Sequence, residues 1–188
     1  MRAVQALKEQ IQILKNENAS LRAKVAFFEN HPTIAQGIKG ERIIAKIVPG
    51  DLTTHNQSFD FAASRRSLKL EIKFSRLNNA VRRIKTKPTF RWAWAKPLGE
   101  SGQKVFDRLI LVGEKNAEHK DLYLDKNSPY VFFDIPYKEI LSLTIRTNSG
   151  RYRSIQLTSN PKTAKSTAAV LFRKYQTNAE ELRKKYRI

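Results

Sequence analysis

The segment SFDFAASRRSLKLEIKF, residues 58–74, contains two apolar stretches on either side of the polar tetrapeptide Ser64-Arg65-Arg66-Ser67. From residue 68 to residue 74, apolar and charged side chains alternate, which is typical of a β-strand with one buried face. Because a shift of one residue would turn the apolar faces away from each other, burial decides how the two stretches pair. A turn centred between the two arginines predicts a β-hairpin with Phe61 opposite Leu70. The turn lacks the Asn-Gly pair of a tight hairpin, so this register is defined to within about two residues.

The same hairpin places Asp60 opposite Glu71 and Phe59 opposite Ile72. The two carboxylates would then lie roughly 5 Å apart at their β-carbons, and like charges so placed destabilise a sheet unless a cation lies between them. Carboxylate oxygens, water and a phosphate are the ligands that Mg²⁺ accepts. Lys73 lies on the same strand face as Glu71. The sequence therefore predicts a cluster of two carboxylates and a lysine, and the alternative is a solvated strand face with an ordinary charge pair.

The rest of the chain predicts an α/β protein with a mixed sheet flanked by helices. Asn30-His31-Pro32 separates two helices, and Glu41 completes the inward face of the second helix. The apolar run at 108–112 indicates a strand that is covered on both faces. Phe90, Trp92 and Trp94 share one strand face, where packing in the core is favoured over base stacking. Strands are expected at residues 57–63, 68–74, 89–95, 105–113, 130–135, 141–147 and 152–158, followed by a helical tail from residue 161.

The first thirty residues form the other clear pattern, because apolar residues recur there in alternating steps of three and four. β-Branched residues at the a positions with leucine at most d positions favour a parallel two-stranded coiled coil, in which Asn18 would fix the register. We expect a dimeric coiled coil at residues 1–30 and a second domain at residues 31–188. The alternative is an amphipathic helix that packs on its own domain. The expected dimer interface consists of Val4, Leu7, Ile11, Leu14, Asn18, Leu21, Val25 and Phe28.

The charge balance predicts a polyanionic partner. The chain has 36 lysine and arginine residues against 17 aspartate and glutamate residues, a net charge of +19. Residues 64–96 alone contain eleven basic residues against Glu71, so nucleic acid is the favoured partner. Phosphate contacts from basic residues and base contacts from asparagine and arginine are expected around the hairpin. The expected DNA-binding residues are Arg65, Arg66, Lys69, Arg76, Asn78, Asn79, Arg82, Arg83, Lys85 and Lys87.

Several other classes of protein are disfavoured. The chain has no cysteine, so disulfides and cysteine zinc sites are absent and a reducing cytoplasm is expected. No run of about eighteen apolar residues and no charged-then-apolar leader occurs, so we expect neither membrane insertion nor secretion. His31, His55 and His119 are scattered, and no Gly-rich phosphate loop is present.

The spacing of Asp60, ten further residues and Glu71-Ile72-Lys73 resembles the D…(D/E)xK signature of the PD-(D/E)xK nuclease superfamily, which has the restriction-endonuclease-like fold. The similarity covers about residues 31–160 and includes Glu41, because a helix before the signature often adds an acid. One departure is Phe59, where the signature has proline. By this resemblance Asp60, Glu71 and the carbonyl of Ile72 would bind Mg²⁺, and Lys73 would orient or activate the attacking water.

The resemblance, the dimerising segment and the charge together predict a homodimeric, Mg²⁺-dependent endonuclease that cuts double-stranded DNA, and within this class they favour a type II restriction endonuclease. Within the same class, a homing endonuclease or a repair or junction-resolving nuclease is the alternative. From another class, a non-catalytic DNA-binding protein dimerised by the coiled coil is the alternative, and an RNA-binding basic domain is a third.

Overall fold

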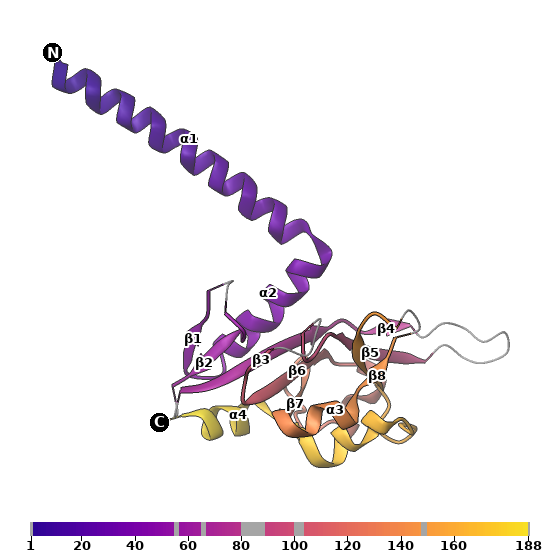
Figure 1. The fold of residues 1–188 in the computed structure, drawn as a ribbon. Coiled ribbons are helices and arrows are strands. Elements are labelled where there is room, and N and C mark those ends of the chain that lie inside the picture. The colour runs from indigo at the N-terminus through magenta and orange to yellow at the C-terminus, as the bar shows by residue number, and fades with distance from the viewer. Residues whose placement is uncertain are drawn as a thin grey trace. The chain divides into compact units, whose positions relative to one another are not determined.

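The computed structural model describes residues 2–54, 57–64, 67–79, 89–99, 104–147 and 150–187. The chain divides into two compact units, Met1–Ile38 and Lys39–Ile188. The helix α2, Pro32–Ala45, runs through the boundary between the units. Figure 1 shows the succession of helices and strands along the chain. None of the described helices combines the length and the apolar character that a membrane span requires.

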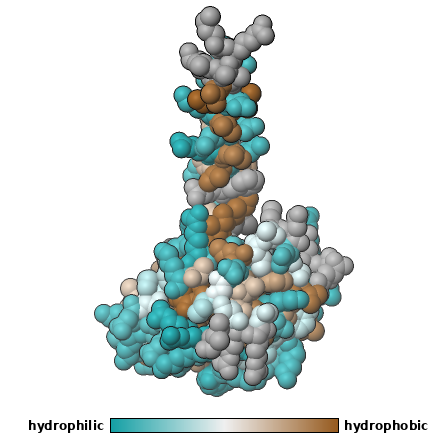
Figure 2. Space-filling model, turned by 90° about the vertical axis from the view of Figure 1, so that its left-hand side faces the viewer, coloured by the Kyte–Doolittle hydropathy of each residue, from teal (hydrophilic) through white to brown (hydrophobic). Residues whose placement is uncertain are grey.

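The first unit consists of α1, Arg2–Asn30, and the beginning of α2. The backbone N–H of Ala35 donates to the carbonyl of His31, so α2 begins at the expected break. The predicted a and d side chains are half exposed or more at Leu7, Ile11, Leu14, Leu21 and Val25. They form a hydrophobic stripe along α1 (Figure 2). The helix is therefore confirmed, and its pairing with a second chain stays a prediction; the side chains of Val4 and Phe28 are outside the described part of the structure.

The second unit is mixed α/β, and its described strands form two sheets, one with six strands and one with four. The larger sheet has the order β1-β2-β3-β6-β7-β10. Its strands are β1 Gly50–Leu52, β2 Phe61–Ala63, β3 Leu68–Ser75, β6 Arg108–Glu114, β7 Tyr130–Pro136 and β10 Gln176–Thr177. The strand β3 pairs antiparallel with β2 and parallel with β6, which makes the sheet mixed.

The hairpin of β2 and β3 has the predicted register, because Phe61 lies opposite Leu70. The apolar run 108–112 is the centre of β6 and is buried between β3 and β7, as expected. Phe59 departs from the prediction. It packs against a different core cluster from Phe61 and Ile72, because β2 begins only at Phe61 and the chain before it no longer follows the alternation of the strand.

The smaller sheet has the order β4-β5-β9-β8, with β4 Asn78–Asn79, β5 Phe90–Ala95, β9 Arg153–Thr158 and β8 Ile145–Arg146. Trp92 and Trp94 of β5 are buried in a cluster that also contains Leu111 of β6 and Phe133 of β7. Their indole N–H groups donate to carbonyl oxygens of β6, Trp92 to Glu114 at 2.8 Å and Trp94 to Val112 at 3.0 Å. The core role of both tryptophans is therefore confirmed.

Helices cover the other face of the larger sheet. Ile44 of α2 and Leu182 of α4, Ala179–Tyr186, share a buried cluster with Ile72 of β3 and Ile110 of β6. Gly40 permits a close approach of α2 to β3, because a β-carbon at this position would lie 2.8 Å from the β-carbon of Phe74. The residue after this contact is Glu41, so the packing of α2 on β3 positions that carboxylate.

The expected strand at 141–147 and the expected helical tail from 161 are wrong in part. The chain forms a short helix α3, Ile140–Leu143, before β8. The tail contains η4 Thr167–Ala169, a π-helical turn η5 Leu171–Tyr175 and then β10, before the helix α4. Gln176 interrupts the helical spacing because its backbone pairs with Phe133 of β7. The 3₁₀ helices η2 Ala117–Leu122 and η3 Tyr137–Glu139 were not expected.

Candidate active site

Two hydrogen bonds, one of its main chain and one of its side chain, hold Asp60 against the strand β3. Its N–H donates to the carbonyl of Leu70 at 3.0 Å, and its Oδ2 accepts a hydrogen bond from the N–H of Ile72 at 2.8 Å. The side chain of Asp60 is largely buried, with an exposed fraction of 17%. These two bonds extend the hairpin to Asp60, the residue before β2. The main chain of β3 therefore sets the position of Asp60 relative to Glu71.

Glu71 lies at the centre of the site and is fully buried, with an exposed fraction of 0%. Its Oε1 lies 2.5 Å from the Nζ of Lys73, two residues along the same face of β3. Burial raises the pKa of Glu71, the charge of Lys73 acts in the opposite direction, and the negative charge of Asp60 raises it further. The alternative of a solvated strand face is wrong for Glu71, because water does not reach it.

Lys104 contacts both carboxylates and was not predicted from the sequence. Its Nζ donates to both oxygens of Glu71, at 2.6 and 2.7 Å, and lies 3.6 Å from Oδ1 of Asp60. The segment before β6 is joined to β3 by two hydrogen bonds of 2.8 Å. The N–H of Asp107 donates to the carbonyl of Lys69, and the N–H of Lys69 donates to Oδ2 of Asp107. Burial lowers the pKa of Lys104, but its contacts with Glu71 and Asp60 outweigh burial and raise it above its ordinary value.

Glu41 brings a third carboxylate to the same place. Burial raises its pKa, and so do the negative charges of Asp60 and Glu71, whereas Lys73 and Lys104 lower it. The charges of all four neighbours therefore act on Glu41. The chain thus gathers three acids and two lysines from α2, from the segment before β2, from β3 and from the segment before β6.

A divalent cation at this place would need several oxygen ligands from the surrounding side chains, main chain and water. Within the described ranges, no three or more histidine, cysteine, aspartate or glutamate side chains converge closely enough to bind a metal ion by themselves. Asp60 and Glu71 nevertheless already enclose a positive charge, because the ammonium group of Lys104 lies between them. Their hard oxygen atoms therefore fit a cation such as Mg²⁺, provided that main-chain and water oxygens complete its coordination.

The expected DNA-binding residues can be located only in part. Lys69, Arg76 and Asn78 are exposed, and the amide of Asn78 donates to the carbonyl of Arg76 at 2.9 Å. The ammonium of Lys69 lies 5.5 Å from the centre of the Phe59 ring. The side chain of Asn79 and the residues Arg65, Arg66, Arg82, Arg83, Lys85 and Lys87 lie outside the described part of the structure.

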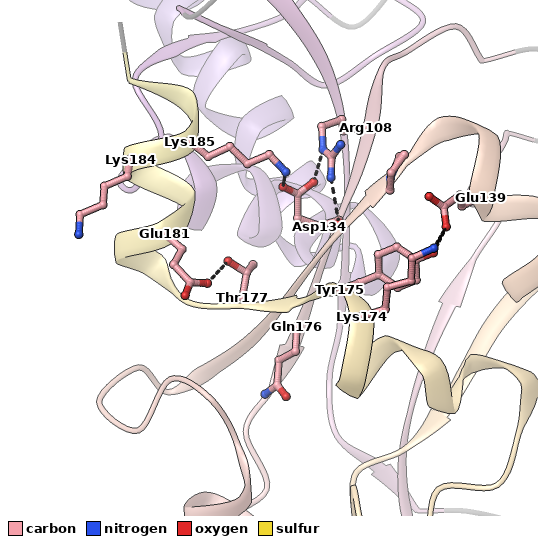
Figure 3. Close-up of a pocket in the computed structure, with 11 residues that line it drawn as sticks. Arg108, Asp134, Glu139, Lys174, Tyr175, Gln176, Thr177, Glu181, Lys184 and Lys185 are labelled. Carbon is pink, nitrogen blue, oxygen red and sulfur yellow. Dashed lines mark hydrogen bonds and ion pairs between the residues drawn. The ribbon is translucent and has the colours of Figure 1, made fainter.

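A separate cavity of about 650 Å³ lies between β7, β10 and α4 (Figure 3). Asp134 of β7 is buried beside it and accepts from Arg108 and Lys185, each at 2.5 Å, and from the hydroxyl of Tyr186 at 3.0 Å. These contacts tie α4 to β6 and β7. The network around Asp134 therefore has a structural role.

No protein-family model matches the chain, and no curated protein sequence matches it.

Proposed function

We propose that this protein is a metal-dependent endonuclease of double-stranded DNA, with the restriction-endonuclease-like fold and the active site of the PD-(D/E)xK superfamily. The observation that carries the proposal is that Lys73 of β3 contacts the buried Glu71, and that Lys104 joins Glu71 to Asp60, with the charge of Glu41 coupled to all of these groups. Burying the charge of Glu71 carries a desolvation cost that its contacts with Lys73 and Lys104 offset only in part, because its pKa stays raised by burial. Carboxylates perturbed in this way cluster at functional sites, so the arrangement favours a functional role.

Each side chain has a task that follows from its position. Asp60 and Glu71, with the main-chain carbonyl of Ile72, would hold Mg²⁺, and Glu41 would hold its water ligands. Lys73 contacts Glu71 and has a quarter of its surface exposed, so its ammonium can orient a water molecule toward a phosphate. Bound Mg²⁺ would neutralise the charge of the phosphorane-like transition state and stabilise the leaving oxygen.

The helix α1 supports a homodimer. The groove along it has a volume of about 440 Å³ and is lined by Ile11, Leu14 and Asn18, three of the predicted a and d residues. In a parallel pair of helices, such grooves accept the side chains of the second copy. Two subunits related by a two-fold axis would place one active site on each strand of the duplex, which favours a type II restriction endonuclease and a palindromic target.

Two other functions remain as alternatives. A homing or repair nuclease would use the same site on a different DNA substrate. A non-catalytic DNA-binding dimer would use α1 and the basic surface alone, and it is disfavoured by the buried Glu71, since DNA binding gives no reason to bury a carboxylate among lysines.

The test is cleavage of supercoiled plasmid DNA by the purified full chain with Mg²⁺. Asp60→Asn and Lys73→Met should each lower the rate by at least about a hundredfold, in the range seen when a group acting in the transition state is lost. The exposed residues Asp121 and Lys126 provide matched controls, and Asp121→Asn and Lys126→Met should cut like the wild type. Undiminished cleavage by Asp60→Asn or Lys73→Met would remove the proposed site, and DNA binding without any cleavage would select the non-catalytic alternative.

A further inference from the structure

Lys104 lies where the proposed function requires a metal ion. Its Nζ is 2.6 and 2.7 Å from the two oxygens of Glu71 and 3.6 Å from Oδ1 of Asp60. An ion bound by both carboxylates would need the same space and the same oxygen atoms. Lys104 and a divalent cation therefore exclude each other from this position.

The charges of the cluster favour such an exchange. Glu41, Asp60 and Glu71 carry three negative charges when ionised, and Lys73 and Lys104 carry two positive charges. A divalent cation added to all five groups would leave one excess positive charge in a largely buried place, whereas the same cation without Lys104 leaves the cluster neutral. Coulombic repulsion therefore opposes simultaneous binding of the Lys104 ammonium and the divalent cation, and the lack of space opposes it as well.

The surroundings of Lys104 allow it both to reach the carboxylates and to leave them. Its side chain keeps 29% of its surface exposed, so the ammonium has a path to solvent on a flexible four-carbon stem. Gly99 lies against this stem, because a β-carbon at Gly99 would be 3.1 Å from Cγ of Lys104. Asp60 and Glu71, by contrast, are fixed by β3 and its hydrogen bonds.

We propose that Lys104 is a positioning residue that occupies the cation position between Asp60 and Glu71 in the metal-free protein and is displaced from it by the divalent cation. The inference rests on the proposed function, since it concerns the same two carboxylates. In the metal-free state Lys104 compensates their repulsion and keeps the site assembled. Once displaced, its ammonium is free to face the DNA phosphates at the edge of the site.

The experiment is calorimetric titration of the full chain with Mn²⁺, without DNA, at constant pH and ionic strength. The Mn²⁺ binding that the wild type shows and Glu71→Gln lacks is assigned to the site at Glu71. Lys104→Met should bind Mn²⁺ on the order of tenfold more tightly than the wild type, a change of about 1.4 kcal/mol. Lys104→Arg retains the competing charge and should bind like the wild type, and Lys126→Met is the control for loss of an exposed lysine.

The possible results separate the inference from the proposed function. Equal or weaker binding by Lys104→Met, with the wild type binding normally, would overturn the inference and leave the proposed function intact. If neither the wild type nor Lys104→Met binds Mn²⁺ at the Glu71 site, the proposed function fails and the inference fails with it. If Lys104 only stabilised the fold of the site, Lys104→Met would bind Mn²⁺ more weakly than the wild type, which is a change of the opposite sign. Lys104→Gln serves in the same titration if Lys104→Met does not fold.

Discussion

Alanine at Gly40 tests whether the close approach of α2 to β3 holds the site together. A β-carbon at this position would lie 2.8 Å from the β-carbon of Phe74 and 3.4 Å from Cγ2 of Ile72. Gly37 lies three residues earlier in the same helix, and a β-carbon there meets no atom of the described residues within 4 Å. The two substitutions are chemically identical, so their difference isolates the steric contact with β3.

The magnitude follows from two opposing effects. Alanine is favoured over glycine inside a helix by about 1 kcal/mol, so Gly37→Ala should raise the free energy of unfolding by up to that amount. At Gly40 the same gain opposes a clash with a β-carbon, which no rotation of the Phe74 side chain can remove, and overpacking of a core costs about 1–3 kcal/mol. Gly40→Ala should therefore be less stable than Gly37→Ala by about 1–3 kcal/mol.

Urea unfolding followed by tryptophan fluorescence measures this difference, because Trp92 and Trp94 are buried in the second unit. The plasmid assay on the same variants reports the position of Glu41, the residue next to Gly40. Gly40→Ala should cut more slowly than Gly37→Ala, since a displaced α2 moves this carboxylate. If the two variants were equally stable, the close contact of α2 with β3 at Gly40 would not be the feature that positions the site.

Three further predictions concern assembly, titration and the buried network. Leu14→Asp should make the protein monomeric in analytical ultracentrifugation, whereas Ile13→Asp, an equally exposed apolar residue outside the predicted seam, should remain dimeric; a dimeric Leu14→Asp would exclude the coiled coil. Because burial and neighbouring negative charge raise the pKa of Glu41, ionising it in the folded state costs stability. Glu41→Gln should therefore become more stable relative to the wild type as the pH rises above 4.5, the ordinary pKa of glutamate, and a pH-independent difference in the free energy of unfolding contradicts this. Asp134→Ala should lose about 1–3 kcal/mol of stability, because it leaves the buried hydroxyl of Tyr186 without its acceptor, and a loss as small as that of the exposed Asp121→Ala would remove the structural role of this network.

The hairpin was predictable from sequence for a physical reason. Alternating apolar residues between 68 and 74 decide which faces must meet, the centre of the turn then defines the register to within about two residues, and Phe61 does lie opposite Leu70. The same argument was wrong at Phe59, because β2 begins only at Phe61 and the residues before it do not follow the alternation of a strand. Periodicity thus predicted the part of the site that β3 itself carries, including the shared face of Glu71 and Lys73.

Lys104 was beyond the reach of such arguments. It reaches Glu71 because β6 runs parallel to β3 and the segment before β6 is hydrogen-bonded to β3, and local periodicity does not reveal which strands become neighbours. The strand β10 was not predicted for a related reason. Gln176-Thr177 is too short to show an alternating pattern, and its partner β7 lies more than forty residues away in the chain.

The strand β3 has hydrogen-bonded neighbours on both edges, β2 on one and β6 on the other. Its amide protons should consequently be among the slowest in the molecule to exchange with deuterium. The separation of Asp60, Glu71 and Lys73 is dictated by peptide groups, which amino-acid replacement leaves unchanged. Substitutions of the apolar residues that pack against β3 should therefore lower the thermal stability of the protein before they change the spacing of the two acids and the lysine.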